Sequence, residues 1–172
     1  MLEILAREGL RAIFFVVGEQ VERRPQLAAR IAAAGHLVAL HGYRHRFQFR
    51  TAAAGAETDL RRGAAAIEDA VGASPGWHRP PYGIYSPGGL EAARAAGMAS
   101  LLWSRWGKDW RKYTTAGRIA SRATRGLGPG EVILLHDADF YSSRHSHRRT
   151  VEALPLIAAE LKRQGLDTVL PI

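Results

Sequence analysis

Cysteine is absent from the 172 residues of this sequence. Its absence excludes thiol nucleophiles, thiolate metal sites and disulfides, so a metal ion would need histidine, aspartate or glutamate ligands. Long apolar runs are absent too, because no stretch approaches the ~20 apolar residues that a membrane-spanning helix needs. Residues 1–10 also lack the basic segment and following apolar segment of a secretory signal peptide. We therefore expect no integral membrane segment.

Acidic residues are scarce relative to basic ones. The 24 Lys and Arg against 16 Asp and Glu give a formal net charge of +8. The arginines are scattered through alanine-rich stretches, and the one cluster, at residues 144–149, contains no aromatic side chain. Nucleic-acid-binding proteins more often show a clustered basic run with interleaved aromatics. We expect no nucleic-acid partner, and attraction to an anionic cell wall or membrane surface is the milder interpretation of the charge.

The apolar pattern predicts an α/β fold in one domain that spans residues 1–172. Hydrophobic residues make up 47% of the chain and charged residues 23%, as in compact globular domains. Short apolar runs predict strands at residues 12–17, 37–40, 77–79, 99–103, 132–135 and 167–170. Helical spacing predicts helices at residues 1–10, 25–34, 57–71, 89–96, 118–125 and 149–164. This alternation is typical of parallel βαβ units.

Polar residues recur where the predicted strands end. His41, Arg79, Asp109 and His136 all lie at or just after the C-terminal ends of apolar runs. In barrel-type α/β folds the active site is assembled at that end of the strands. We therefore expect these side chains to converge on one pocket.

The histidines His41 and His45 lie four residues apart. On a helical turn this spacing presents both imidazoles to one side, as a divalent metal site requires. Taken alone, the pair fits equally well with surface histidines in a polar loop.

Two further segments carry candidate chemistry. The segment RPPYG at residues 79–83 is a rigid turn, which either aims a backbone N–H at an oxyanion or serves structure alone. Residues 130–137 form a buried strand that ends at His136, either a general acid or a strand-end histidine with its hydrogen bonds satisfied. The carboxylate of Asp109 could orient an imidazole and favour its protonated form.

In their order along the chain, these segments resemble the NodB-type polysaccharide deacetylases. AIFFVVG, a helix and then GHLVALHGYRH resemble the second section of that family, HRPPYG its third motif, DW its fourth and LLH its fifth. The resemblance runs from about Leu2 to Ile172. It implies a distorted (β/α) barrel that removes N-acetyl or O-acetyl groups from sugars of a polysaccharide such as chitin oligomers or peptidoglycan, with the acetylated glycan as the partner.

The resemblance also implies a metal site and an oxyanion site. His41 and His45 match the two histidines of an Asp-His-His set that holds a divalent ion, Zn²⁺ first, with Co²⁺, Ni²⁺ or Mn²⁺ as the other candidates. Arg79 matches the arginine that braces the catalytic base. The backbone N–H of Tyr82 matches the oxyanion donor.

The remaining matched residues concern proton delivery and the acetyl pocket. His136 matches the general acid, and Asp109 matches the aspartate that tunes it. Trp110 and Leu134 match residues that line the pocket for the acetyl methyl group.

The sequence departs from the family pattern at three places. The family's first motif, an Asp-Asp-Gly at the end of a first strand, has no counterpart here, so the catalytic base, one metal ligand and the first barrel strand are expected to be missing. Asp59, the first aspartate, lies on a predicted helix and is not expected in the site. Gly42 stands where the family has Ser or Thr, and Trp106 where an aspartate is common.

The missing motif leaves a second interpretation, an inactive deacetylase-like carbohydrate-binding domain. A barrel without its first strand has unpaired edges and should be marginal. We therefore expect a misplaced start or truncated coding sequence rather than an evolved pseudoenzyme. If a signal segment was lost upstream, we expect a cell-envelope or extracellular protein. If there was no such segment, we expect a cytoplasmic one.

Overall fold

The computed structural model describes residues 1–48 and 53–171. Within it the chain forms two compact units, one of residues 12–102 and one of residues 1–11 together with 103–171. Both units combine helices with parallel strands, which confirms the predicted α/β class. The expectation of a single domain over residues 1–172 stays a prediction. None of the described helices has the length and apolar character that crossing a bilayer requires.

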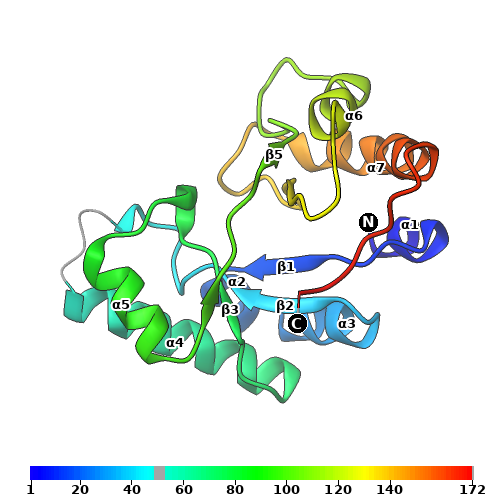
Figure 1. Ribbon diagram of the computed structural model, residues 1–172. Coiled ribbons are helices and arrows are strands. Elements are labelled where there is room, and N and C mark those ends of the chain that lie inside the picture. The colour runs from blue at the N-terminus through cyan, green and yellow to red at the C-terminus, as the bar shows by residue number, and fades with distance from the viewer. Residues whose placement is uncertain (49–52, 172) are drawn as a thin grey trace. The chain divides into compact units, whose positions relative to one another are not determined.

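The unit of residues 12–102 is built on a four-stranded parallel sheet with the order β1-β2-β3-β4. Figure 1 shows β1, β2 and β3 next to one another. The register pairs Val16 with Leu40, Leu40 with His78, and His78 with Ser100. The strands are β1 Ile13–Val16, β2 Leu37–Leu40, β3 Trp77–His78 and β4 Ala99–Ser100. Because parallel strands end at the same edge, the residues that follow β2 and β3 are brought together there.

Helices alternate with the strands of this sheet along the chain. They are α2 Gly18–Arg23, α3 Pro25–Ala33, α4 Ala53–Val71 and α5 Pro87–Ala95. Proline begins both α3 and α5, and Ser86 caps α5 by accepting a hydrogen bond from the Gly89 N–H at 3.0 Å. The face of α4 that bears Leu60, Gly63 and Ile67 is buried, and α4 packs on α2, α3, α5 and β2. This face carries the helical spacing that predicted the helix.

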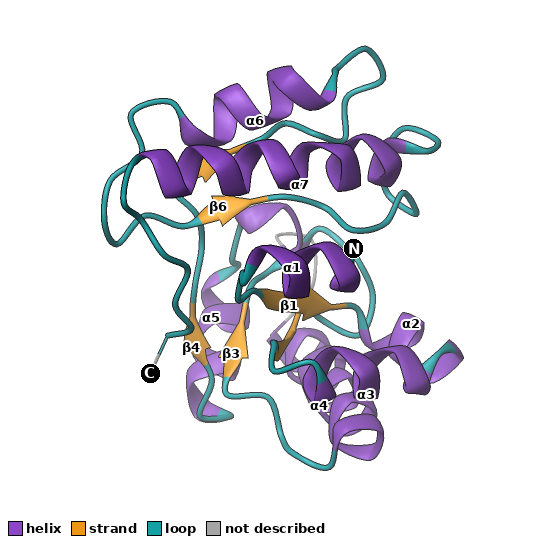
Figure 2. Cartoon of the chain, turned by 90° about the vertical axis from the view of Figure 1, so that its right-hand side faces the viewer, coloured by secondary structure: helices purple, strands orange, loops and turns teal. Residues whose placement is uncertain are grey.

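The second unit places two helices over a short two-stranded parallel sheet. Figure 2 shows α6 and α7 alongside one another, close to β6. Its elements are α1 Leu2–Glu8, β5 Arg105–Trp106, α6 Ala116–Thr124, β6 Ile133–Leu134 and α7 Ser146–Arg163. The core between α6 and α7 consists of small and branched apolar side chains, namely Ile119, Ala120, Ala123, Ala153, Ile157 and Leu161.

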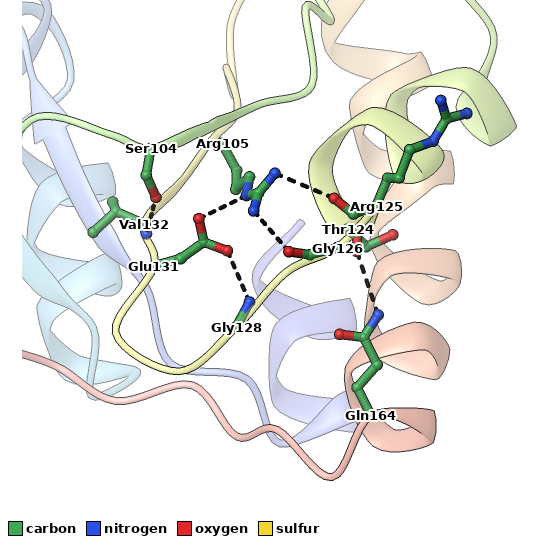
Figure 3. Close-up of polar contacts among 9 residues, drawn as sticks. All are labelled: Ser104, Arg105, Thr124, Arg125, Gly126, Gly128, Glu131, Val132 and Gln164. Atoms are coloured by element: carbon green, nitrogen blue, oxygen red, sulfur yellow. Dashed lines mark hydrogen bonds and ion pairs between the residues drawn. The ribbon is translucent and has the colours of Figure 1, made fainter.

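A partly exposed arginine network links the segment between α6 and β6 (Figure 3). Arg105 Nε donates to Glu131 Oε1 at 2.7 Å, and its two terminal nitrogens donate to the carbonyls of Arg125 and Gly126 at 3.2 and 2.7 Å. Glu131 Oε2 accepts a hydrogen bond from the Gly128 N–H at 2.8 Å. These bonds tie the segment just before β6 to the end of α6.

Two expectations about the elements were wrong. Residues 167–170 form no strand, because Val169 is 83% exposed and Thr168 instead accepts a hydrogen bond from the Arg11 N–H at 2.7 Å. The pattern also missed β5 and α2. Helix α2 is separated from α3 only by Arg24, whose position before Pro25 disfavours helical geometry.

Candidate functional site

The eight predicted site residues divide between the two units. Residues 12–102 contain His41, His45, Arg79 and Tyr82, and residues 103–171 contain Asp109, Trp110, Leu134 and His136. The four residues of the first unit are linked to one another by contacts. In the second unit, contacts link Asp109 and Trp110 to His136. The expected convergence of both groups on one pocket stays a prediction.

His41 and His45 lie side by side in a loop. His41 follows β2 directly, and its N–H donates to the Val16 carbonyl at 2.8 Å. The two imidazole rings are 5.2 Å apart between centroids and meet edge to face at 61°. Of the two settings that the spacing allows, the structure has the loop, because Gly42 adopts a φ of +88° that leaves the helical region. The close approach therefore comes from the fold of the loop.

The protonation of His41 is fixed by its neighbour. His41 Nδ1 lies 2.6 Å from the Arg79 carbonyl oxygen, which can only accept, so Nδ1 carries the proton and Nε2 keeps a lone pair. Burial lowers the pKa of His41 to about 3, with the Arg79 carbonyl opposing that shift. At neutral pH the imidazole is uncharged, which is the form that ligates metal ions.

Arg79 is buried behind the site. Its Nε donates to the Leu101 carbonyl at 2.7 Å and Nη2 donates to the Leu102 carbonyl at 2.9 Å. The guanidinium also lies 4.0 Å from the centre of the Phe15 ring. Burial lowers the pKa of Arg79 to about 10, so the side chain remains a cation at neutral pH. Arg79 therefore supplies positive charge to the same edge of the sheet that carries His41.

Tyr82 occupies a strained backbone position beside His45. It lies in the 3₁₀ helix η2 (Pro81–Gly83) with a φ of +61°, a left-handed value that a tyrosine adopts at a cost. Its ring meets His45 at 4.7 Å and Phe47 at 5.9 Å between centroids, both edge to face. The rigid prolines before Tyr82 hold this geometry, and such strain is found at functional sites.

The sequence-based expectation about Asp59 was wrong. Asp59 lies on α4, as predicted, but its carboxylate reaches the loop that carries the histidines. Oδ2 accepts a hydrogen bond from the Tyr43 N–H at 2.7 Å, and Oδ1 accepts one from the Arg44 N–H at 3.3 Å. One signal was available, because a glycine inside a helix often marks close backbone approach and Gly63 lies one turn beyond Asp59.

In the other unit, Asp109 holds His136 at two points. Asp109 Oδ1 lies 2.8 Å from His136 Nδ1, and Oδ2 accepts hydrogen bonds from the His136 N–H at 2.6 Å and the Thr150 hydroxyl at 2.8 Å. Asp109 is fully buried. Burial alone would raise its pKa, but the hydrogen bonds to His136 and Thr150 outweigh burial and the pKa of Asp109 is lowered. The ionised carboxylate directs His136 Nε2 away from itself.

An aromatic column leads to His136. The ring of Trp110 meets that of His136 at 5.6 Å, and Trp106 stacks on Trp110 at 4.6 Å. Trp103 continues the column at 5.7 Å from Trp106. Leu134 is buried in β6, where its register partner is Trp106. The tryptophan at position 106, a departure from the family pattern, is thus part of the packing around Trp110.

The fit to a metal ion is partial. Two neutral imidazoles match the donor chemistry of zinc, which normally takes three protein ligands in a catalytic site. Across residues 1–48 and 53–171, however, no group of three His, Cys, Asp or Glu side chains is arranged to hold an ion.

Comparison with known proteins finds relatives that match most of the chain. The sequence profile of polysaccharide deacetylases matches residues 1–101. A chitooligosaccharide deacetylase from a Bradyrhizobium strain is 32% identical over 174 residues, covering 97% of this chain and 79% of its own. A family 4 carbohydrate esterase from Streptomyces lividans, solved with acetate, superposes with a TM-score of 0.88 at 30% identity, over 98% of this chain and 83% of its own.

A catalytically silent relative is similar as well. A carbohydrate esterase pseudoenzyme of family 4 from Bacillus anthracis superposes with a TM-score of 0.86 at 27% identity, over 97% of this chain and 56% of its own. These likenesses support the predicted NodB-type fold. The chain belongs to the polysaccharide deacetylase family.

Proposed function

We propose that this protein hydrolyses the acetamide of N-acetylated sugars in a polysaccharide such as chitin oligomers or peptidoglycan. The observation that carries the proposal is the His41–His45 pair, in which His41 is neutral and keeps the lone pair of Nε2. Membership of the deacetylase family supports the same chemistry. Acetate, which is bound in the related Streptomyces lividans esterase, is the acid that this reaction would release.

The chain's own residues carry distinct parts of the proposed reaction. Water adds to the acetyl carbonyl and loses a proton to solvent, the C–N bond breaks, and His136 Nε2 delivers a proton to the departing amine and is then reprotonated from solvent. Asp109 holds His136 through Nδ1. The backbone N–H of Tyr82 stabilises the oxyanion, and Arg79 adds positive charge. Trp110 and Leu134 line the pocket for the methyl group, by resemblance to the family.

His41 and His45 would hold a divalent ion, Zn²⁺ first and Co²⁺, Ni²⁺ or Mn²⁺ as the other candidates. Such an ion polarises the acetyl carbonyl and lowers the pKa of a bound water. With two imidazoles alone, we expect weak binding, because an anionic third ligand contributes much of the affinity.

A second candidate is an inactive domain that binds acetylated glycans without cleaving them. It is favoured by the lack of a three-ligand group among the described residues and by the likeness to a pseudoenzyme. In that case the proposed acetyl pocket of Trp110 and Leu134 would bind an acetyl group, but no base would activate a water to attack it.

Acetate release from chitin oligomers and from peptidoglycan would separate the two candidates. We would compare this chain, with zinc, and a version preceded by a strand that ends in Asp-Asp-Gly. We expect little release by the chain itself and zinc-dependent release by the extended version, abolished by His136→Ala. A folded, zinc-loaded extended version that binds chitin oligomers but releases no acetate would favour the inactive glycan-binding domain.

A further inference from the structure

The backbone between His41 and His45 is held by a carboxylate from outside the loop. Asp59 accepts hydrogen bonds from two successive backbone N–H groups, those of Tyr43 at 2.7 Å and Arg44 at 3.3 Å. Both residues lie within the four-residue step that separates the two histidines. A carboxylate that receives two N–H donors makes charge-assisted hydrogen bonds, which are stronger than neutral ones.

Sterics leave this loop little freedom against α4. At Gly42 a Cβ would come within 2.9 Å of Asp59 Oδ2, and at Gly63 a Cβ would lie 2.6 Å from Leu40 Cδ1 and 3.0 Å from the Tyr43 nitrogen. The loop backbone therefore lies directly on the helix surface, one turn from Asp59. Close approach of this kind requires glycine.

The side chain of Tyr43 anchors the loop on its other side. Its hydroxyl donates to Glu22 Oε2 at 2.8 Å, and the Arg62 guanidinium lies 3.8 Å from the centre of its ring. Arg62 also pairs with Glu22 at 3.5 Å. Tyr43 is 7% exposed, so its position is fixed by packing as well as by these contacts. With the side chain anchored, the hydrogen bonds to Asp59 set the direction of the peptide groups.

We infer that Asp59 is a positioning residue for the proposed metal pair, fixing the His41–His45 loop so that both imidazoles are preorganised for one ion. This inference rests on the proposed function. Asp59 touches neither imidazole in the contacts described, so it acts through the backbone of Tyr43 and Arg44. A loop fixed before the ion arrives loses less conformational entropy on binding.

Zinc titration of the whole chain, followed by calorimetry, tests the inference. Residues that orient metal ligands typically contribute about 10- to 100-fold in metal affinity. We expect about a 10-fold weaker zinc affinity in Asp59→Ala and a smaller loss in Asp59→Asn, which keeps one oxygen acceptor. The matched control is Asp69→Asn, an exposed aspartate on the same helix. We expect the control to bind like the unaltered chain.

Two readouts separate positioning from a general structural role. Amide hydrogen exchange at Tyr43 and Arg44 should accelerate in the Asp59 variants and not in Asp69→Asn. The absorption bands of bound Co²⁺ report ligand geometry. They should also change in the Asp59 variants and stay unchanged in Asp69→Asn. Thermal unfolding by circular dichroism identifies variants that fail to fold, and Asp59→Asn decides the matter if Asp59→Ala does not fold.

The outcomes distinguish this inference from the proposed function. If His45→Ala weakens zinc binding but folded Asp59→Asn and Asp59→Ala bind as the unaltered chain does, Asp59 is not a positioning residue. If zinc binding is undetectable, or unchanged by His41→Ala and His45→Ala, the proposed metal pair itself is overturned. In that second case faster exchange at Tyr43 and Arg44 would still show that Asp59 fixes the loop.

Discussion

At the scale of single residues, the acceptor beside each histidine determines which ring nitrogen carries the proton. His41 Nδ1 faces a neutral backbone carbonyl, whereas His136 Nδ1 faces the buried carboxylate of Asp109. A carbonyl in a desolvated setting leaves the neutral imidazole favoured, as a metal ligand requires. The buried carboxylate of Asp109 instead accepts from His136 Nδ1 and so fixes the orientation of the His136 ring. The two environments therefore suit two different kinds of chemistry.

Asp109→Asn should make the protein less stable at neutral pH and alter its acid unfolding. The lowered pKa of Asp109 means that its contribution is complete above the ordinary value of 3.8 and is lost as pH falls through the folded-state pKa. We expect the variant to be less stable by about 1–3 kcal/mol at pH 7. Below about pH 4 the difference should begin to shrink, because Asp109 of the unfolded chain then takes up a proton, and it should vanish as pH falls through the lowered pKa of Asp109 in the folded state.

Urea unfolding of both chains at pH 7 and pH 3 measures this difference. Exposed Asp69→Asn serves as the control and should leave the free energy of unfolding unchanged. Equal stability of Asp109→Asn and the unaltered chain at pH 7 would mean that the buried carboxylate gains no net free energy from His136 and Thr150.

At the scale of elements, long apolar signals were predictable and short or context-dependent ones were not. The runs that became β1 and β2 are continuous and apolar, and they pair in parallel, with Val38, Ala39 and Leu40 of β2 buried. The two residues of β5 are an arginine and a tryptophan, which give no strand signal by themselves. The histidine spacing fitted either a helical turn or a polar loop, and the φ of Gly42 decides for the loop. Asp59 was missed because its role depends on α4 packing against the loop, which no local pattern encodes.

Gly63→Ala and Gly117→Ala should shift stability in opposite directions. Alanine favours a helix over glycine by about 1 kcal/mol. At Gly117 in α6 a Cβ meets nothing within 4 Å, so this variant should gain up to about 1 kcal/mol. At Gly63 in α4 the Cβ would lie 2.6 Å from Leu40 Cδ1, and we expect a net loss of about 1–3 kcal/mol. Urea unfolding of both variants tests the pair. If Gly63→Ala is more stable than the unaltered chain, Leu40 and the Gly42–Tyr43 backbone can shift at little cost in free energy.

At the scale of the whole molecule, charge is spread rather than gathered. Arg23, Arg30 and Arg94 are exposed and lie in or at the ends of α2, α3 and α5, with no ion pair described for them. The net charge of +8 therefore includes exposed, widely spaced arginines, consistent with the scattered sequence pattern. A diffuse field of this kind raises the local concentration of an anionic polymer without selecting its sequence or shape. Such a field would affect where the protein accumulates, but it carries no information about which bond the proposed site would act on.

Binding to anionic cell-wall polymer should accordingly depend on salt, whereas binding to neutral chitin should not. Screening lengths fall from ~10 Å at ~0.1 M salt to ~3 Å at ~1 M, which removes most attraction between exposed charges. We expect the fraction that sediments with anionic cell wall to fall steeply over that range. Replacing Arg23, Arg30 and Arg94 by glutamine removes three positive charges and should weaken the low-salt binding, while lysine at the same positions should preserve it. If binding changes neither with salt nor with the glutamine replacements, specific contacts rather than diffuse charge recognise the polymer. The tryptophans of the aromatic column, Trp103, Trp106 and Trp110, would then be the first residues to substitute.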